Sequence, residues 1–215
     1  MNPYLLVGLS YLVGATPTSY WVGRFAYGVD LRNAGSGNLG ATNTFRVLGW
    51  KAALPVMIVD IGKGWLPAAL FIQLDGSDPW AWALAYGAAA IVGHVFSFWV
   101  RFSGGKGVAT STGVFLAIAP AAVGAGLVVW IVTLAAVRIV SVASLAGAVT
   151  IPVVVFLTEH PGGSLMAWFT VALAAFVFWA HRSNIRRLLN GEEPRIRQGG
   201  KASQAEEAPS AGGLQ

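Results

Sequence analysis

The sequence contains no cysteine, and only 11% of its 215 residues are charged. The absence of cysteine excludes disulfide frameworks, iron–sulfur clusters, thiolate zinc sites and thiol nucleophiles. Soluble globular domains carry about 25% charged residues, which help to cover their surface. A chain with so few charges, 55% hydrophobic residues and a mean hydropathy of +0.63 is therefore expected to lie in a membrane.

Six apolar runs divide the chain, and polar or glycine-rich segments separate them. The runs span residues 3–22, 48–73, 80–100, 108–137, 142–158 and 164–180. An α-helix needs about 20 residues to cross about 30 Å of hydrocarbon, so most runs fit one crossing. No Lys or Arg precedes the first run, so we interpret it as a crossing rather than a cleaved signal peptide.

The basic residues gather in some loops and avoid others. Four Lys or Arg residues lie between positions 23 and 51 and six between positions 182 and 201, whereas loops 74–79 and 159–163 contain none. Cytoplasmic loops carry the excess of Lys and Arg, so the basic loops are expected on the cytoplasmic side. This distribution also explains the formal net charge of +5 without a nucleic-acid partner.

The long run 108–137 decides the number of crossings. Arg101 precedes it and Arg138 follows it, so the chain must cross twice between them if both are cytoplasmic, with Pro120 at the turn. We therefore predict an all-α membrane protein, a seven-transmembrane-helix bundle with the N-terminus outside and the C-terminus cytoplasmic. The alternative is six crossings, which places Arg138 and the C-terminal basic residues outside.

Composition separates one domain from a tail. Residues 1–198 are expected to form a single transmembrane domain. From about Gly199 the chain is rich in Gly, Ser, Ala, Glu and Gln, which cannot build a hydrophobic core. Residues 199–215 are therefore predicted to be a disordered cytoplasmic tail.

A first polar segment, residues 33–46, has the composition of a phosphate-binding loop. Glycines allow successive backbone N–H groups to converge on an anion, and hydroxyl, amide and guanidinium groups add donors. The candidate phosphate-binding residues are Gly35, Ser36, Gly37, Asn38, Gly40, Thr42, Asn43 and Arg46. The glycines also satisfy G-x-G-x-x-G, but no strand precedes them, which argues against a dinucleotide site. The alternative is a tight turn that binds no ligand.

A second polar segment surrounds Lys106 at the start of an apolar run. A lysine among Gly104, Gly105 and Gly107 at a helix N-terminus combines an ammonium group, backbone donors and the helix dipole. It is not a Walker A motif, because glycine rather than Ser or Thr follows the lysine. The alternative is a lysine that extends to the membrane interface without a ligand.

Two further polar segments lie near the C-terminal half of the chain. Ser141 and Ser144 are either phosphate contacts or part of a polar turn. If a helix continues through residues 181–188, His181 and Asn184 lie on one face, where the histidine could act as a base or as a donor to phosphate. The alternative is a basic stretch that only anchors the topology.

Three ionisable residues lie inside apolar runs. Asp60 and Lys63 are three residues apart, and an unpaired charge in hydrocarbon costs roughly 2.5 to 3.5 kcal/mol, so we expect an ion pair or a polar cavity. Either the pair is purely structural or it forms a second wall of the substrate site. His94 is interpreted as a packing residue or a ligand contact.

These segments, taken in order, resemble the PlsY family, the acyl-phosphate-dependent glycerol-3-phosphate acyltransferases of bacterial membranes. The resemblance covers about residues 8–197. The matching motifs are Gly35-Ser-Gly-Asn-Leu-Gly-Ala-Thr-Asn43, Asp60-x-x-Lys63-Gly64, Gly93-His94, Gly104-Gly-Lys-Gly-Val-Ala-Thr110, Ser141-Val-Ala-Ser144, and His181-x-x-Asn184-Ile-x-Arg187-Leu with Gly191-x-Glu193. The chain departs from the usual family residues at Ser97, Trp99, Ser103, Ala180 and Glu192.

The resemblance implies an acyltransferase of phospholipid synthesis. The enzyme would transfer a fatty acyl group from acyl phosphate to the 1-hydroxyl of sn-glycerol 3-phosphate, which yields lysophosphatidate and phosphate. The implied partners are these two substrates and membrane lipids, with no nucleic acid, cofactor or metal. The implied location is the bacterial cytoplasmic membrane, with the active site of a multi-pass monomer on the cytoplasmic side.

Residue roles follow from these two substrates as a hypothesis. The expected catalytic residues are Ser36, Lys106, His181 and Asn184, and the expected phosphate contacts also include the glycines named above, Ser141 and Ser144. The Ser36–Asn43 loop would hold the acyl phosphate, Lys106 would stabilise the charge that develops during transfer, and Arg46, His181 and Asn184 would hold glycerol 3-phosphate. The expected supporting residues are Asp60, Lys63, His94, Arg187 and Glu193. Either His181 or the departing phosphate would accept the hydroxyl proton.

Two other classes of function are also compatible with the sequence. A transporter for a phosphorylated solute would also place polar groups within a helical bundle, but its inverted repeats should appear as matching interrupted helices, and we find none. A structural membrane protein would tolerate mutation of all four polar segments.

Overall fold

The computed structural model describes residues 1–76, 79–160 and 162–196, and every regular element in these ranges is helical. The all-α prediction is therefore confirmed for this part of the chain. The predicted tail, residues 199–215, lies outside the described residues.

The first apolar run does not form one continuous helix. Its elements are α1 (Pro3–Ala15), α2 (Thr18–Trp21), the π-helical turn η1 (Val22–Ala26) and, beyond the run, the 3-10 turn η2 (Leu31–Asn33). Proline disfavours the helical conformation in the residue before it, and α1 ends where Thr16 precedes Pro17. The first apolar run is thus interrupted at Pro17, and its interpretation as a membrane crossing stays a prediction.

In the next segment, the short polar helix α3 is followed by the long apolar helix α4. Its elements are α3 (Ala41–Leu48), α4 (Trp50–Leu66), the π-helical turn η3 (Pro67–Phe71) and α5 (Ile72–Asp75). Gly49, at a φ of 83°, provides the left-handed turn between α3 and α4. The helical conformation continues through Pro67 into η3, where the proline begins a π-helical turn.

The remaining helices follow with short connections. They are α6 (Pro79–Val95), the 3-10 turn η4 (Phe98–Val100), α7 (Val108–Ile118), α8 (Pro120–Val137), α9 (Val140–Leu157), α10 (Gly163–Ala180) and α11 (Arg182–Leu189). The prediction that the run 108–137 divides at Pro120 is confirmed, because Pro120 begins α8 directly after the turn at Ala119.

Within the described ranges, five helical segments are long and apolar enough to cross a membrane. They are Trp50–Asp75, Trp80–Val100, Pro120–Val137, Val140–Leu157 and Gly163–Ala180. Helix α7 has 11 residues, which corresponds to about 16 Å of rise and is shorter than the hydrocarbon layer. The count of seven crossings and their orientation therefore stay predictions.

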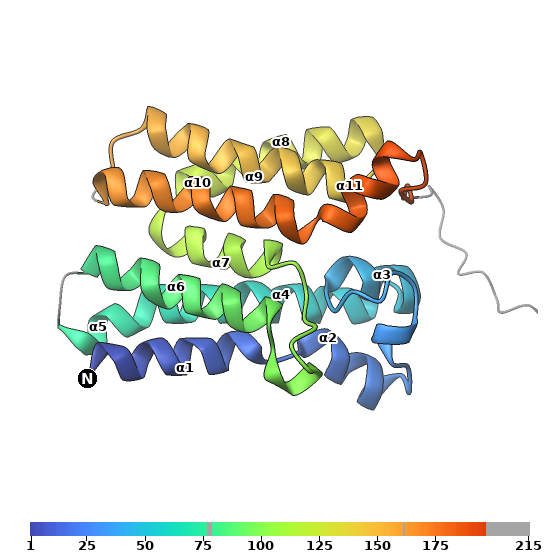
Figure 1. Ribbon diagram of the computed structural model, residues 1–215, viewed down its shortest axis with the longest axis horizontal. Coiled ribbons are helices and arrows are strands. Elements are labelled where there is room, and N and C mark those ends of the chain that lie inside the picture. The colour runs from blue at the N-terminus through green and yellow to red at the C-terminus, as the bar shows by residue number, and fades with distance from the viewer. Residues whose placement is uncertain (77–78, 161, 197–215) are drawn as a thin grey trace, which may run out of the picture.

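The helices form two layers that run roughly parallel to one another (Figure 1). Helices α1, α4 and α6 make one layer, α8, α9 and α10 make the other, and α7 lies between them. The main buried cluster includes Val114 and Phe115 of α7 and Met166 of α10, so it joins the layers. A smaller cluster of Leu31, Leu39 and Val100 supports the polar end.

Glycines allow the closest helix contacts. A Cβ atom on Gly64 of α4 would overlap the carbonyl oxygen of Thr110 on α7, and a Cβ atom on Gly113 of α7 would overlap that of Ile61 on α4. The two backbones therefore touch directly and in both directions, as small residues permit in membrane helices. The same arrangement joins α1 to α6 through Gly14 and Gly93.

The polar segments gather at one end of the molecule. Figure 1 shows α3, α11 and the loop before α7 at this end, and α5 at the opposite end. Helix α11 does not continue α10, because His181, at φ −95° and ψ 7°, interrupts the helical geometry between them. The fold thus brings together segments that are more than a hundred residues apart.

The α4–α7 contact yields a stability prediction. Gly64→Ala should lower the free energy of unfolding by about 1 to 3 kcal/mol, because the new Cβ must push the Thr110 backbone away. Thermal unfolding in detergent measures this. The matched control is Gly62→Ala in the same helix, where no atom lies within 4 Å of the added Cβ. Equal unfolding midpoints for the two variants would contradict the close-contact interpretation.

Candidate functional site

A cavity of about 340 Å³ opens at the polar end, between the two layers. Most of the residues that the sequence analysis selected line it. They are Ser36, Asn38, Gly40, Thr42, Asn43, Arg46, Asp60, His94, Lys106, Gly107, Ser141, Ser144, His181, Asn184 and Glu193. The selected residues that lie outside its wall are Gly35, Gly37, Lys63, Gly104, Gly105 and Arg187.

A chain of hydrogen bonds ties three of the polar segments together. The Lys106 Nζ donates to the Asn184 Oδ1. The Asn184 Nδ2 and the Ser141 Oγ both donate to the Glu193 Oε1, at 2.5 and 2.8 Å, and the Arg187 Nε donates to the other carboxylate oxygen at 2.7 Å. Glu193 therefore holds α9, α11 and, through Asn184, the Lys106 loop in one arrangement.

The glycine-rich loop is organised by Asn43. Its Oδ1 accepts from the Ser36 N–H at 2.8 Å, and its Nδ2 donates to the carbonyls of Ala34 and Leu31 at 3.0 and 3.3 Å. Gly35, at a φ of 61°, permits the turn. The sequence suggested Asn43 as a phosphate contact, whereas all the polar atoms of its side chain are used by the loop backbone here.

The N-termini of α3, α7 and α9 open into the cavity, and the first residue of α9, Val140, lines it. Gly40 caps α3, with the Thr42 side chain exposed beside it, and Gly107 caps α7 at a φ of 81°. The first N–H groups of a helix have no intrahelical acceptor, and the helix dipole favours an anion at this end. With Arg46 and Lys106 nearby, the polar part of the cavity suits two phosphate groups.

Burial sets the charge state of Lys106. Burial lowers the pKa of its amine to about 8, against the opposing effect of Glu193, and Arg187 and Arg46 lower it further. Near neutral pH the amine is mostly protonated and can bind an anion.

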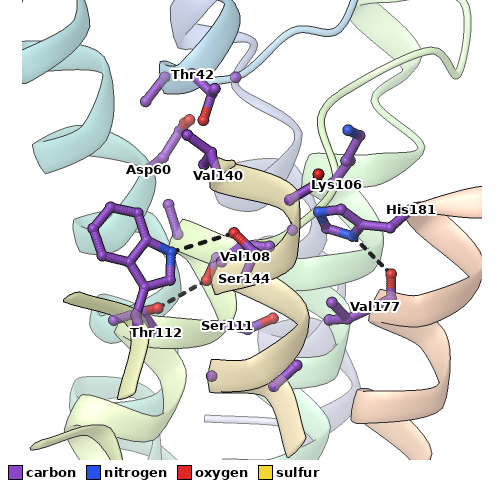
Figure 2. Close-up of a pocket in the computed structure, with 18 of the residues that line it drawn as sticks. Thr42, Asp60, Lys106, Val108, Ser111, Thr112, Val140, Ser144, Val177 and His181 are labelled. Carbon is purple, nitrogen blue, oxygen red and sulfur yellow. Dashed lines mark hydrogen bonds between the residues drawn. The ribbon is translucent and has the colours of Figure 1, made fainter. Parts of the chain in front are cut away.

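His181 is neutral near pH 7. Burial and the Lys106 charge lower its pKa to about 4. Its Nδ1 lies 2.8 Å from the Val177 carbonyl, which can only accept, so Nδ1 carries the hydrogen and Nε2 has a free lone pair. Figure 2 shows the ring beside Lys106, with the contact to Val177.

Glu193 remains a carboxylate. Burial raises its pKa, but the hydrogen bonds from Asn184, Ser141 and Arg187 outweigh burial and lower the pKa below the usual value. The carboxylate balances part of the positive charge at the polar end of the cavity.

The expected ion pair between Asp60 and Lys63 is present. The Lys63 Nζ lies 2.8 Å from the Asp60 Oδ1 and donates to the Thr16 carbonyl at 2.8 Å. Both side chains are buried, and Asp60 and His94 also line the cavity. Asp60 is therefore both a member of a buried ion pair and part of the cavity wall, on the side opposite His181 in Figure 2.

An apolar channel continues from the polar part of the cavity. It lies between α4, α7, α8, α9 and α10, and its walls include Met57, Ile61, Phe115, Val123, Leu127, Trp130, Ile151, Leu173 and Val177. The Trp130 Nε1 donates to the Ser144 Oγ at 3.3 Å, which fixes the indole in the wall. Sequence reasoning missed these residues, because cavity-facing and lipid-facing side chains of apolar helices have the same composition.

Three comparisons connect this architecture to known proteins. Residues 4–191 match the family model described as glycerol-3-phosphate acyltransferase. A glycerol-3-phosphate acyltransferase of Listeria monocytogenes serotype 4a (strain HCC23) is 45% identical over 199 residues, which cover 92% of this chain and 98% of the relative. One from Synechococcus sp. (strain JA-2-3B'a(2-13)) is 46% identical over 188 residues, which cover 87% of this chain and 92% of the relative.

Two solved structures share the fold. A crystal structure of PlsY, an integral membrane glycerol 3-phosphate acyltransferase, in its glycerol 3-phosphate form matches with a TM-score of 0.85 at 34% identity. The match covers 92% of this chain and 96% of that one. The lysophosphatidic acid form matches with a TM-score of 0.82, the same identity and the same coverage.

The charge of Lys106 yields a pH prediction. Anion binding needs the protonated amine, which is present below its pKa of about 8 and is lost as the pH rises through that value. The Kd for inorganic phosphate should therefore rise from about pH 7 to about pH 9.5, approaching tenfold per pH unit at the upper end. Calorimetry on the purified protein measures it, and Lys106→Arg should flatten the profile because arginine stays charged. A pH-independent Kd in the original protein would contradict this assignment.

Proposed function

The chain belongs to the glycerol-3-phosphate acyltransferase family, and from that premise we propose that acyl phosphate is its acyl donor and that the cavity residues carry out the transfer. It is an all-helical integral membrane enzyme that produces lysophosphatidic acid. The observation that supports the proposal best is the continuity of one cavity. A cationic end that includes the N-termini of α3 and α7 leads directly into an apolar channel.

The two ends of the cavity suit the two ends of an acyl phosphate. The fatty chain occupies the channel beside Phe115, Leu127 and Leu173, and the phosphate lies at the N-termini of α3 and α7. The wall residues Met57 and Leu127 are 41% and 54% exposed, so the channel has apolar walls that reach the outer surface of the bundle. A lipid substrate can therefore approach from the bilayer.

The remaining donors suit glycerol 3-phosphate. Arg46 lies exposed at the mouth of the cavity, where it meets a water-soluble anion first. Asn184 is already oriented by Glu193, so its second Nδ2 hydrogen can bind substrate with little loss of side-chain freedom. The Ser141 hydroxyl donates its only hydrogen to Glu193, so it can accept a hydrogen bond from a glycerol hydroxyl. Ser36 lines the cavity through the loop that Asn43 holds.

The transfer step needs positioning more than covalent catalysis. The 1-hydroxyl oxygen attacks the acyl carbonyl carbon, an ester bond forms, and the bond between that carbon and the bridging phosphate oxygen breaks. Lys106 stabilises the negative charge on the carbonyl and on the leaving phosphate. Phosphate is already a good leaving group, so no acyl-enzyme is required.

The departing phosphate is the better acceptor for the hydroxyl proton. The Nε2 of His181 has a free lone pair, but the pKa of this histidine is about 4. A phosphate ester or inorganic phosphate has a second pKa of about 6, so it is the stronger base of the two. The proton of the attacking 1-hydroxyl therefore leaves with phosphate, and the His181 Nε2 accepts a hydrogen bond from the neighbouring 2-hydroxyl of glycerol 3-phosphate.

The membrane orientation follows the basic loops. We assign the cavity to the cytoplasmic side of a bacterial cell membrane, because the loops around Arg46, Arg138 and Arg182 lie at the cavity end and carry the excess of positive charge. Seven crossings remain the proposed topology, and a monomer the proposed unit.

The decisive experiment compares acyl donors. Purified protein in lipid should convert acyl phosphate and glycerol 3-phosphate into lysophosphatidate and one equivalent of phosphate, measured by mass spectrometry and phosphate release. Lys106→Ala should lower kcat by about 100-fold to 1,000-fold, because it removes the charge that stabilises the transition state. The matched control is Lys51→Ala, an exposed lysine in the first turn of α4 that does not line the cavity. Activity with acyl-CoA alone would overturn the proposed donor.

A second prediction concerns the channel. Ala174→Phe places a large ring in the channel wall, so kcat/KM should fall more for acyl phosphates of about 16 carbons than for those of about 8. Each methylene that loses its apolar contact costs up to about 0.8 kcal/mol, or about fourfold in kcat/KM. Ala175→Phe, on the exposed face of the same helix, should leave the ratio unchanged. Equal effects on both chain lengths would place the acyl chain elsewhere.

A further inference from the structure

We propose that Asp60, Lys63 and His94 form a buried positioning network that fixes the backbone before Lys106 and thereby aims its amine into the cavity. The inference rests on the role proposed above for Lys106. None of the three residues needs to touch the reacting atoms for this role.

The network begins with the ion pair inside the bundle. Asp60 and Lys63 are 2% and 6% exposed, and the Lys63 Nζ also donates to the Thr16 carbonyl at the end of α1. A buried pair contributes little net stability, because desolvation offsets the attraction between the charges. Its contacts join α1 and α4 at one point, so its main effect is to hold their relative position.

The network reaches α6 through His94. The His94 Nδ1 lies 3.8 Å from the Asp60 Oδ1, and the ring is buried between α4 and the Lys106 loop. Asp60 thus faces Lys63 on its own helix and His94 on the neighbouring one.

The loop before Lys106 lies directly on His94. Gly105 donates its N–H to the His94 carbonyl at 3.2 Å, and Gly104 donates to the Val95 carbonyl at 2.9 Å. A Cβ atom on Gly105 would overlap the His94 ring, so the backbone and the imidazole are in direct contact. The next residue is Lys106, and the Cα position of Lys106 therefore depends on where the His94 ring lies.

A small shift of this loop has a large kinetic effect. The Lys106 amine reaches its place by a hydrogen bond to Asn184 across the cavity, and a displaced loop would weaken that contact. Misplacement of a catalytic group by about 1 Å can lower the rate by about 100-fold. Asp60 and His94 also line the cavity, so direct contact with substrate is the competing interpretation.

A double-mutant cycle separates the two interpretations. Asp60→Asn and His94→Gln are each made in the original protein and in Lys106→Ala, with Glu159→Gln as an exposed carboxylate control. If the network acts through Lys106, each change should lower kcat by about 10-fold to 100-fold in the original protein but by less than about twofold in Lys106→Ala. An equal loss in both backgrounds overturns the proposal, because the residue then acts on substrate or on overall folding.

A second readout does not depend on turnover. The rate at which an amine reagent modifies Lys106, quantified by peptide mass spectrometry, reports how much of the amine is uncharged. A displaced lysine becomes more solvated, so its pKa rises from about 8 toward the usual value and its reactivity at about pH 8 should fall by about tenfold or more.

The test remains informative if one variant does not fold or if the original protein shows no transfer activity. His94→Gln leaves the ion pair intact, so it tests the network even if Asp60→Asn does not fold around the unpaired Lys63 charge. If the original protein transfers no acyl group, the proposed function fails, whereas the reactivity of Lys106 still tests the network. Unchanged Lys106 reactivity in every folded variant overturns the proposal.

Discussion

The hydrogen bond from Lys106 to Asn184 is the contact on which the site depends. It joins the loop that enters α7 to α11 at the other end of the sequence, and Glu193 extends it to Ser141 of α9. Without these contacts, the lysine and arginine side chains at this end would repel one another with no carboxylate between them. Because each partner is oriented by the next, the donors are in place before substrate arrives, which is the main requirement of a reaction that relies on positioning.

Packing between the membrane-embedded helices fixes the position of the Lys106 loop. Helix α7 touches α4 backbone to backbone through Gly64 and Gly113, so it cannot slide along α4 without steric overlap. Its N-terminus, which carries Gly107 next to Lys106, is therefore fixed relative to α4. Helix association in lipid gains little from the hydrophobic effect, so close glycine contacts are an effective way to define such positions. The rigid pair of helices serves as the base on which the polar loop is built.

The polar residues of the site could be identified from the sequence, because polar residues are rare in an apolar chain. Ser36, Lys106, Asn184 and Glu193 all belong to short polar segments, and the division at Pro120 followed from charge and helix length. Other features depend on information that composition does not hold. The role of Asn43 depends on backbone carbonyls that the turn at Gly35 brings within reach. The walls of the channel depend on the rotation of each helix, which an entirely apolar helix does not reveal through its periodicity.

Glu193 is an acidic residue in a site proposed to bind anions, yet its carboxylate organises that site. A carboxylate repels phosphate, but here both oxygens already accept hydrogen bonds, from Asn184, Ser141 and Arg187. A phosphate in the cavity therefore experiences the carboxylate together with the polar groups bonded to it, so the electrostatic repulsion from Glu193 is reduced. The same charge opposes the effect of burial on the pKa of the Lys106 amine and so helps to keep the amine protonated. When a substrate phosphate binds, its negative charge also favours the protonated form of Lys106. The reacting group itself then helps to keep the amine charged.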